Sequence, residues 1–369
     1  MKVLFVLGSL LSAFCLSFLS IDSGWSLPRG NHASTGASEV SLPEKIDVLW
    51  EYEIKGLGFD AGPIIAEGTV FAADADGNVI ALKLNNGEAL WKKKFDASFL
   101  ASPAFDAGAV YIGDTDGKLH ALDATNGNEK WVYDAKREID AGANFYGDNV
   151  LVTSQSGSLF AVSKKDGQLQ WQYETGDQLQ CGPTLAGKLT FLGGCDQHLH
   201  IVDVETGKAV VDKIPIEAPT GSTPCVVGTL ALVPTYKGQI WAFETPSNKL
   251  AWKFDEPELA SEFKNSVASS QGIVVAVSGS RKVLGLDVES GKVLWNKNLK
   301  RRTDNSPVIA GNHAIVAGSD GRVYRYELKT GDELPVIELK GGFLGSPAVA
   351  DGRIVLASDR GTVYCLGAK

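Results

Sequence analysis

Hydrophobic and polar residues alternate in short runs along most of the chain, and glycine-containing turns separate the runs. Within residues 102–134 this pattern predicts a first strand that ends at 104–105, followed by strands over 109–113, 118–123 and 129–133. Asp116-Gly117 and Asn126-Gly127 are typical of tight hairpin turns, because such turns need positive φ angles. The segment therefore predicts four short antiparallel strands.

The same unit returns about every 40 residues. The residue that opens each first strand recurs with steps of 40, 40, 40, 41, 43, 40 and 40, at Pro63, Pro103, Ala143, Pro183, Pro224, Val267, Pro307 and Pro347. A tryptophan follows the same spacing at Trp50, Trp91, Trp131, Trp171, Trp252 and Trp295. Val211 and Pro335 occupy the two remaining places. Four strands in about 40 residues form one blade of a β-propeller, in which such tryptophans pack as wedges between blades.

The two ends of the chain set the number of blades. The last unit stops at Lys369 after its third strand, and Val48–Tyr52 near the start supplies a strand with the missing tryptophan. We therefore predict an all-β, eight-bladed propeller of four-stranded antiparallel blades over residues 48–369, closed by the N-terminal strand. Closure of the ring protects strand edges, which would otherwise invite aggregation.

The unit SPAFDAGAVYIGDTDGKLHALDATNGNEKW, Ser102–Trp131, resembles the repeat of PQQ-like (pyrroloquinoline-quinone repeat) β-propellers, and its counterparts cover nearly the whole mature chain. The resemblance implies an eight-bladed fold. The family includes dehydrogenases that hold PQQ and calcium at the centre of the ring, and a non-catalytic BamB-like branch of secreted bacterial propellers. Trp25–Asn31, followed by Thr35-Gly36, resembles the lead-in of many secreted bacterial members.

Several features expected of the dehydrogenases are missing from the sequence. No two cysteines are adjacent, no Cys-x-x-Cys-His motif is present, and the units have no long insertions between them. We therefore predict no catalytic, cofactor-binding or metal-binding residues and no cofactor. The alternative is a small-molecule or PQQ-type cofactor-binding protein, a degenerate quinoprotein.

The first 26 residues resemble a secretory signal peptide. Met1-Lys2 precedes the uncharged apolar stretch 3–19, and small polar residues follow, so we expect cleavage between Ser20 and Ser26. Residues 27–47 then form an N-terminal lead-in. Phe14 before Cys15 argues against a lipid anchor, and no other stretch is apolar enough to cross a membrane. We predict an exported monomer that is periplasmic or extracellular.

The net charge argues against nucleic acid as a partner. The chain has 35 Lys+Arg and 44 Asp+Glu, a net charge of −9, whereas proteins that bind nucleic-acid backbones are basic. We therefore expect protein or peptide partners in the cell envelope and no nucleic acid. The resemblance and the lack of a catalytic set together predict a non-enzymatic interaction scaffold, BamB-like in role, for outer-membrane protein assembly or another envelope complex.

One unusual cluster lies in the fourth unit. Cys181 and Cys195 belong to one end of this blade, and Cys225 belongs to the next. His198 and His200 lie two residues apart on a strand and so face the same side. Three alternatives remain: free thiols, a disulfide between two of the three cysteines, or a zinc or copper site that uses Cys195 and a histidine.

A candidate interaction rim has an apolar and a charged part. Apolar residues precede most first strands by four positions, among them Phe59, Phe99, Phe263 and Phe343. They either grip a partner peptide or pack between blades. Basic residues of the sixth and seventh units lie at the same end of the propeller, at Arg281, Lys282, Arg301 and Arg302. An acidic segment, Asp255–Glu258, precedes them, and such juxtaposed charges either orient a protein partner or form an ordinary solvated rim.

Overall fold

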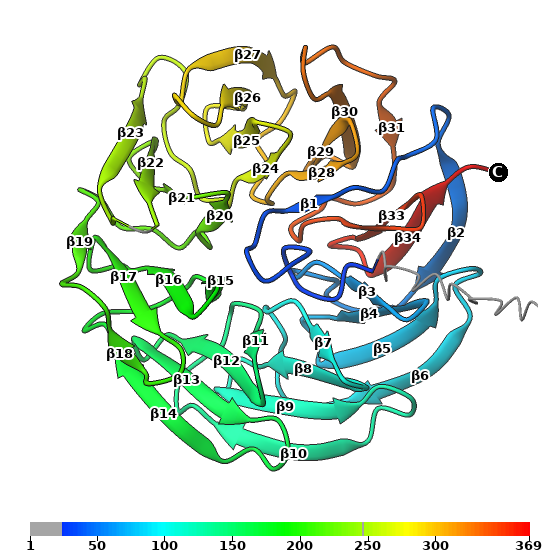
Figure 1. Cartoon of the computed structure of the whole chain (residues 1–369). Helices are drawn as coiled ribbons and strands as arrows, with labels where there is room; N and C mark the ends of the chain where they lie inside the picture. Colours follow the sequence, from blue (N-terminus) through cyan, green and yellow to red (C-terminus); the bar gives the residue numbers. More distant parts are fainter. Residues whose placement is uncertain (1–23, 246) are drawn as a thin grey trace, which may run out of the picture.

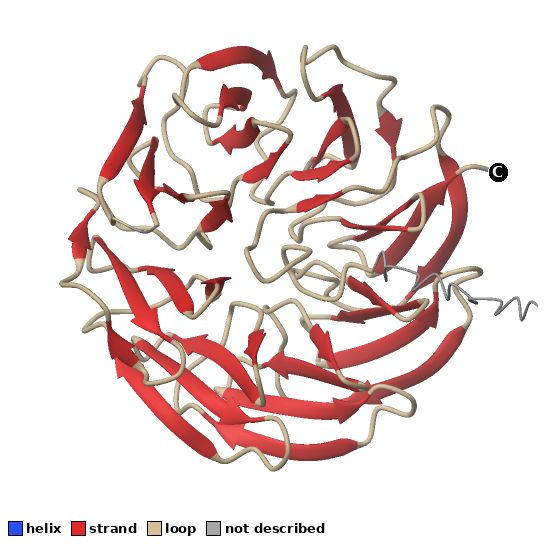
Figure 2. Cartoon of the chain, viewed as in Figure 1, coloured by secondary structure: helices blue, strands red, loops and turns tan. Residues whose placement is uncertain are grey.

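The computed structural model describes residues 24–245 and 247–369, which form an eight-bladed β-propeller (Figure 1). Strands and loops make up all of this part of the chain (Figure 2). It therefore offers no helix with the length and apolar character that a membrane span requires. Each blade is one sheet of antiparallel strands that follow one another from the central channel to the outside, and blade 7 has one additional parallel strand on its inner edge.

The first four blades follow each other directly along the chain. Blade 1 contains β3 (Ile64–Ala66), β4 (Thr69–Ala73), β5 (Asn78–Lys83) and β6 (Ala89–Lys94). Blade 2 contains β7 (Ala104–Asp106), β8 (Ala109–Gly113), β9 (Lys118–Asp123) and β10 (Glu129–Asp134). Blade 3 contains β11 (Asn144–Tyr146), β12 (Asn149–Ser154), β13 (Ser158–Ser163) and β14 (Leu169–Glu174). Blade 4 has a split outer edge and contains β15 (Thr184–Ala186), β16 (Leu189–Gly193), β17 (His198–Asp203), β18 (Lys208–Ala209) and β19 (Ile214–Pro215).

The remaining blades include two that use segments from the N-terminal region. Blade 5 contains β20 (Cys225–Val227), β21 (Leu230–Pro234), β22 (Gln239–Glu244) and β23 (Leu250–Asp255). Blade 6 contains β24 (Ala268–Ser270), β25 (Ile273–Ser278), β26 (Lys282–Asp287) and β27 (Val293–Asn298). Blade 7 contains β1 (Ala37–Ser38), β28 (Val308–Ala310), β29 (His313–Ala317), β30 (Arg322–Glu327) and β31 (Ile337–Glu338). Blade 8 contains β32 (Ala348–Ala350), β33 (Arg353–Ala357), β34 (Thr362–Gly367) and β2 (Asp47–Glu53).

The predicted closure of the ring is confirmed. β2 pairs antiparallel with β34, and Trp50 lies opposite Cys365. Figure 1 shows these two strands side by side although they come from opposite ends of the chain. The four strands predicted for blade 2 also agree with the structure to within one residue at their ends. The local alternation and the turn glycines were therefore sufficient to place these elements.

Six tryptophans fill the seams between blades, as the repeat predicted. Each lies on an outer strand, and its indole N–H donates a hydrogen bond of 2.8–3.1 Å to a backbone carbonyl of the next blade. The donor–acceptor pairs are Trp50–Leu84, Trp91–Ala124, Trp131–Lys164, Trp171–Val204, Trp252–Val288 and Trp295–Leu328. Each of these buried or partly buried indoles thus finds the hydrogen-bond acceptor that its N–H needs.

Small residues make room for each of these indoles. The residue opposite the tryptophan in the third strand is Ala81, Ala121, Ala161, Ala242, Gly285 or Cys365. A turn glycine of the next blade packs on the ring; a Cβ at Gly127 would lie 2.7 Å from Trp91, and its φ is +69°. Blades 4 and 7 lack the tryptophan, and there the third strand carries Ile201 and Arg325 instead.

Residues 25–38 run around the channel and bind the innermost strands, which the sequence did not predict. This segment forms backbone hydrogen bonds with six blades, through Ile65, Phe105, Leu185, Val226, Ser269 and Ile309. It ends in β1, which pairs parallel with β28. In Figure 1 this blue segment lies over the centre of the ring. We call residues 25–38 the channel segment.

Candidate functional site

A small cavity lies beside the channel segment at the centre of the ring. The cavity has a volume of about 200 Å³, and corresponding loop residues of all eight blades line it, with Pro28 and Arg29 as the part contributed by the channel segment. Arg29 is 7% exposed and donates through Nη2 to the carbonyls of Val267 (3.0 Å) and Pro307 (2.9 Å). Burial lowers the pKa of Arg29 to about 10. The buried guanidinium of Arg29 thus links the channel segment to blades 6 and 7.

An acidic side chain lies at the same cavity. Burial raises the pKa of Asp140 to about 6, although a hydrogen bond from Gln155 (3.0 Å) opposes the shift. A carboxyl group in a poorly hydrated site is harder to ionise, which accounts for the direction. The cavity therefore combines one buried guanidinium with a carboxyl group of weakened acidity.

A PQQ-type cofactor with calcium, as the family resemblance implies, does not fit this channel. Sites for small ligands usually enclose about 300–1,000 Å³, more than the volume left here. Among the described residues no group of three or more His, Cys, Asp or Glu side chains could hold a metal ion. The channel segment itself takes up the centre of the ring, so we derive no chemistry through such a cofactor.

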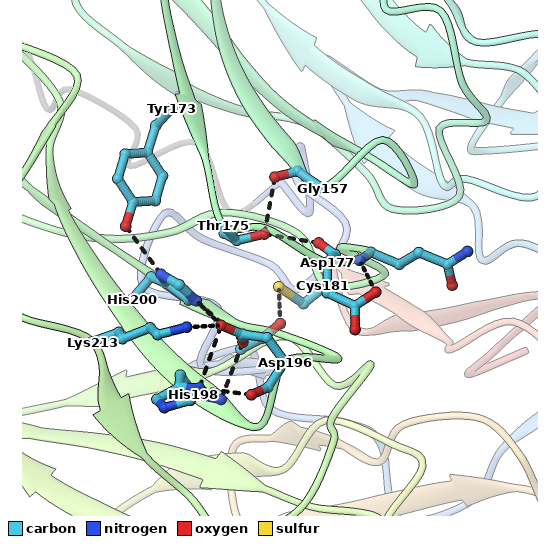
Figure 3. Close-up of polar contacts among 11 residues, drawn as sticks. Gly157, Tyr173, Thr175, Asp177, Cys181, Asp196, His198, His200 and Lys213 are labelled. Carbon is cyan, nitrogen blue, oxygen red and sulfur yellow. Dashed lines mark hydrogen bonds and ion pairs between the residues drawn. The ribbon is translucent and has the colours of Figure 1, made fainter.

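The cluster in blade 4 is an ion-paired network around Asp196 (Figure 3). His200 is 2% exposed; its Nε2 lies 3.1 Å from a carboxylate oxygen of Asp196, and its Nδ1 lies 3.0 Å from the hydroxyl of Tyr173. The ammonium of Lys213 lies 3.1 Å from Asp196, and His198 Nδ1 lies 2.6 Å from the Asp196 backbone carbonyl. The network joins a turn, an outer edge and the neighbouring blade.

Electrostatics in this network agree with a structural role. Burial raises the pKa of Asp196, but His200 and Lys213 outweigh it and hold this pKa below its usual value. Burial is the main cause that lowers the pKa of His200; the charges of Lys213 and His198 act in the same direction, and Asp196 opposes the shift. Both ring nitrogens of His200 already have protein partners, so it is not presented as a metal ligand.

The described cysteines all carry free thiols in this structure, and a disulfide between two of them stays a prediction. Cys181 is buried, and its thiol lies 3.2 Å from the carbonyl of Gly193. Cys195 is half-buried near it, whereas Cys225 lies near Arg29. Burial raises the pKa of Cys181 and of Cys225 to about 12, so neither is readily ionised to a nucleophilic thiolate.

The apolar part of the predicted rim is wrong. Phe59, Phe99, Phe263 and Phe343 are all 0% exposed and belong to the cores between blades. Each backbone N–H donates to a carbonyl in a turn of the preceding blade, at Ser358, Asp74, Thr235 and Gly318. The chain therefore turns inward at these positions, and the side chains pack between blades as the second interpretation expected.

The charged part of the rim lies at the surface. Arg281 and Arg301 are exposed, and Lys282 and Arg302 are partly exposed. The guanidinium of Arg302 bonds to Glu262 (2.8 Å) and Asp304 (3.0 Å), so the basic and acidic sectors meet there. Asp304 also lines the central cavity, and this rim therefore borders the channel mouth.

Comparison with known proteins identifies the family to which the chain belongs. A family model described as "Outer membrane protein assembly factor BamB" matches residues 43–180 and 174–369. The chain belongs to the BamB family. The two matches together cover all eight blades, so the assignment rests on the whole propeller and not on one repeat.

Individual members of the BamB family are distant relatives. BamB of Salmonella typhimurium is 29% identical over 165 residues, which cover 44% of this chain and 40% of that protein. BamB of Escherichia coli is 26% identical over 197 residues, 50% of this chain and 49% of that protein. The chain thus aligns with less than half the length of each of these two relatives.

Solved structures share the fold. BamB from Moraxella catarrhalis superposes with a TM-score of 0.76 at 22% identity, covering 88% of this chain and 98% of that one. A quinohemoprotein alcohol dehydrogenase from Comamonas testosteroni superposes with a TM-score of 0.80 at 14% identity, covering 94% of this chain and 80% of that one. Because both the BamB family and redox enzymes use this propeller, the fold alone does not choose a function.

Proposed function

We propose that this chain is an exported, non-enzymatic scaffold that acts in outer membrane protein assembly. The single observation that carries the proposal is the BamB family match over both halves of the propeller. The central channel supports it, since its 200 Å³ cavity leaves little room for a cofactor, and the described residues provide no metal-binding group.

The charged rim is the surface that we propose for a protein partner. Arg281, Lys282 and Arg301 present positive charge next to the acidic residue Glu262, on a face whose loops are short. Complementary charges of this kind accelerate and orient association more than they increase affinity. The partner would be another protein of the assembly machinery, and we expect this chain to bind it as a monomer.

Export is part of the proposal. Trp25 is 1% exposed and exchanges backbone hydrogen bonds with Ile65 (2.7 and 2.9 Å), so a cleavage that preserves the fold would fall before Trp25, inside the window Ser20–Ser26. Cys15 and the rest of residues 1–23 lie outside the described part, and the absence of a lipid anchor stays a prediction. Mass spectrometry of the mature N-terminus tests both points.

Capture of partners from the native envelope tests the function. The full chain with a C-terminal tag is cross-linked in envelopes, purified and analysed by mass spectrometry, and a β-barrel assembly component is the expected product. Recovery of no such component contradicts the proposed function.

A charge-reversal variant locates the surface. Arg281→Glu, Lys282→Glu and Arg301→Glu in one chain should reduce capture, whereas reversal of three lysines on outer edges, Lys92, Lys208 and Lys249, is the matched control. If both variants capture the partner as the wild type does, the charged rim is not the interface.

A further inference from the structure

At the seam between blades 7 and 8 a buried arginine occupies the space that an indole fills elsewhere. Arg325 lies in β30 at the position that holds a small residue in the blades with a tryptophan, and Pro335 stands in the place of that tryptophan. Arg325 is 2% exposed. Its Nε and Nη1 atoms are buried and have no hydrogen-bond partner within the described residues. Burial lowers the pKa of Arg325.

A groove of about 550 Å³ opens beside this guanidinium. Ile46, Pro335, Val336 and Ile337 form its apolar walls, and Glu44 and Lys45 complete the lining. The outer strand of blade 7 is reduced to the two residues of β31, because a proline has no N–H to give to a ladder. In Figure 1 β31 and the segment leading into β2 lie near one another.

Packing alone does not call for a charge at this position. Blade 4 also lacks the tryptophan, and there Ile201 fills the corresponding space with an apolar side chain. A buried cation without a partner destabilises the fold, whereas a hydrocarbon side chain of similar size does not. The guanidinium of Arg325 is thus better explained by a ligand that neutralises it than by the needs of the seam.

We propose that this groove binds a segment of a partner protein that places a carboxylate between apolar side chains. Arg325 receives the carboxylate, since a planar guanidinium and a carboxylate form paired, charge-assisted hydrogen bonds. The apolar walls receive the flanking side chains. The proposal rests on the proposed scaffold function, because it takes the occupant to be protein.

The lining of the groove favours a peptide over a free acyl chain. Lys45 and Glu44 bring opposite charges to it, and the Lys45 side chain is 87% exposed. A polar peptide backbone is compatible with such a mixed lining, whereas a bare hydrocarbon chain is not. A peptide with an acidic side chain between two apolar ones therefore fits this groove: the acidic group faces the guanidinium, the apolar side chains face the apolar walls, and the backbone lies near the charged residues.

Binding of a defined peptide to the full mature chain tests the proposal. The probe is Ac-Ser-Val-Glu-Leu-Ser-NH2, titrated by calorimetry, with the Glu→Gln peptide as its uncharged counterpart. The Gln peptide should bind about tenfold more weakly or not at all, the loss expected from one charge-assisted contact. Hydrogen exchange should slow at residues 44–46 and 335–337 when the Glu peptide binds.

Two variants and one competitor complete the experiment. Arg325→Met should abolish binding without lowering the midpoint of urea unfolding, which separates loss of the site from loss of the fold. Arg322→Met is the matched control, because Arg322 lies on the same strand but is paired with Asp320 and Glu338. Octanoate is the acyl-chain competitor.

Several results would overturn the proposal. Equal affinity for the Glu and Gln peptides, no binding of either, or unchanged binding to Arg325→Met would each do so. Binding of octanoate but not of the Glu peptide would show an acyl ligand instead. Capture of assembly proteins from envelopes by a chain that binds neither peptide would overturn this site alone. Peptide binding without such capture would overturn the proposed function alone.

Discussion

The two seams on either side of blade 7 are neighbours, but they are filled in opposite ways. On one side Trp295 lies opposite Gly285 and donates to the carbonyl of Leu328 (2.9 Å). On the other side Pro335 lies just before the short outer strand β31, and the large side chain, Arg325, comes from the adjacent strand β30. The comparison shows that neighbouring seams are occupied by different residue types, which come from different strands of the blade.

The seam between blades 4 and 5 supports the same conclusion. Val211 replaces the tryptophan, and Ile201 replaces the small residue of the third strand. The turn glycine that packs on the indole in other blades is Asn248 here, with a φ of +55°. At this seam all three residues, Val211, Ile201 and Asn248, thus differ from their counterparts in the other blades. They differ together because all three contribute to the same seam.

Loss of an indole should have the largest effect. Trp295→Ala removes a 7%-exposed side chain and leaves the Leu328 carbonyl without its donor, so we expect the free energy of unfolding to fall by about 3–5 kcal/mol. Urea unfolding followed by circular dichroism measures it. The neighbouring Leu294, 50% exposed, is the control, and Leu294→Ala should change stability by no more than about 0.5 kcal/mol. Similar losses for both variants would contradict the wedge role.

Adding an indole to a seam that lacks one should be harmful. Val211→Trp has no space, because Ile201 and Asn248 already fill it, and overpacking should cost about 1–3 kcal/mol. The triple variant Val211→Trp, Ile201→Ala, Asn248→Gly should recover most of this loss. Unfolding midpoints of the single, double and triple variants measure the coupling. Additive effects would mean that the three positions do not share one seam.

A smaller effect is expected at a turn glycine. Gly127→Ala forces an alanine to a φ of +69° and brings its Cβ within 2.7 Å of Trp91, and the left-handed backbone alone costs about 1–2 kcal/mol. In a Trp91→Ala background the backbone cost should remain, together with a contact to the flexible Lys93 side chain, whose Cγ would lie 2.9 Å from the new Cβ. A double-mutant cycle measures the difference. An equal cost in both backgrounds would show that the indole does not restrict this turn.

The smallest effect is expected at the charged seam, and it has the opposite sign. Arg325→Met removes a buried cation without a partner, so the free energy of unfolding should rise by about 1 kcal/mol. Ile201→Met at the equivalent apolar position serves as the control and should not stabilise. If Arg325→Met lowers stability, the guanidinium has a packing role in the free protein that the described contacts do not reveal.

Prediction from the sequence succeeded for features that are encoded within a single repeat of about 40 residues, namely its strands and turns. The strand positions in blade 2 and the closure of the ring by β2 follow from alternation, turn glycines and a repeat that is cut by the two chain ends. The same pattern could not separate the two interpretations of Phe59 and its counterparts. An apolar residue at a loop end can face a partner or a neighbouring blade, and only the packed structure shows which.

Arg29 and Arg325 show the limit of sequence reasoning for the candidate sites. Each looks like an ordinary basic residue in the chain, and each is nearly completely buried in the structure. Arg29 is held by Val267 and Pro307, more than 200 residues away. The cavity and the groove therefore depend on contacts for which the sequence carries no local pattern.

The amino-acid sequence alone determined the all-β class, the number of blades and the closure of the ring, because strand alternation and turn chemistry act over a few residues and repeat. The tertiary structure alone decided the path of residues 25–38 through the channel, the inward turn of the phenylalanines and the burial of the two arginines. These features depend on contacts between residues that are far apart in the sequence and come together only when the eight blades close into a ring. Those contacts determine which side chains are buried.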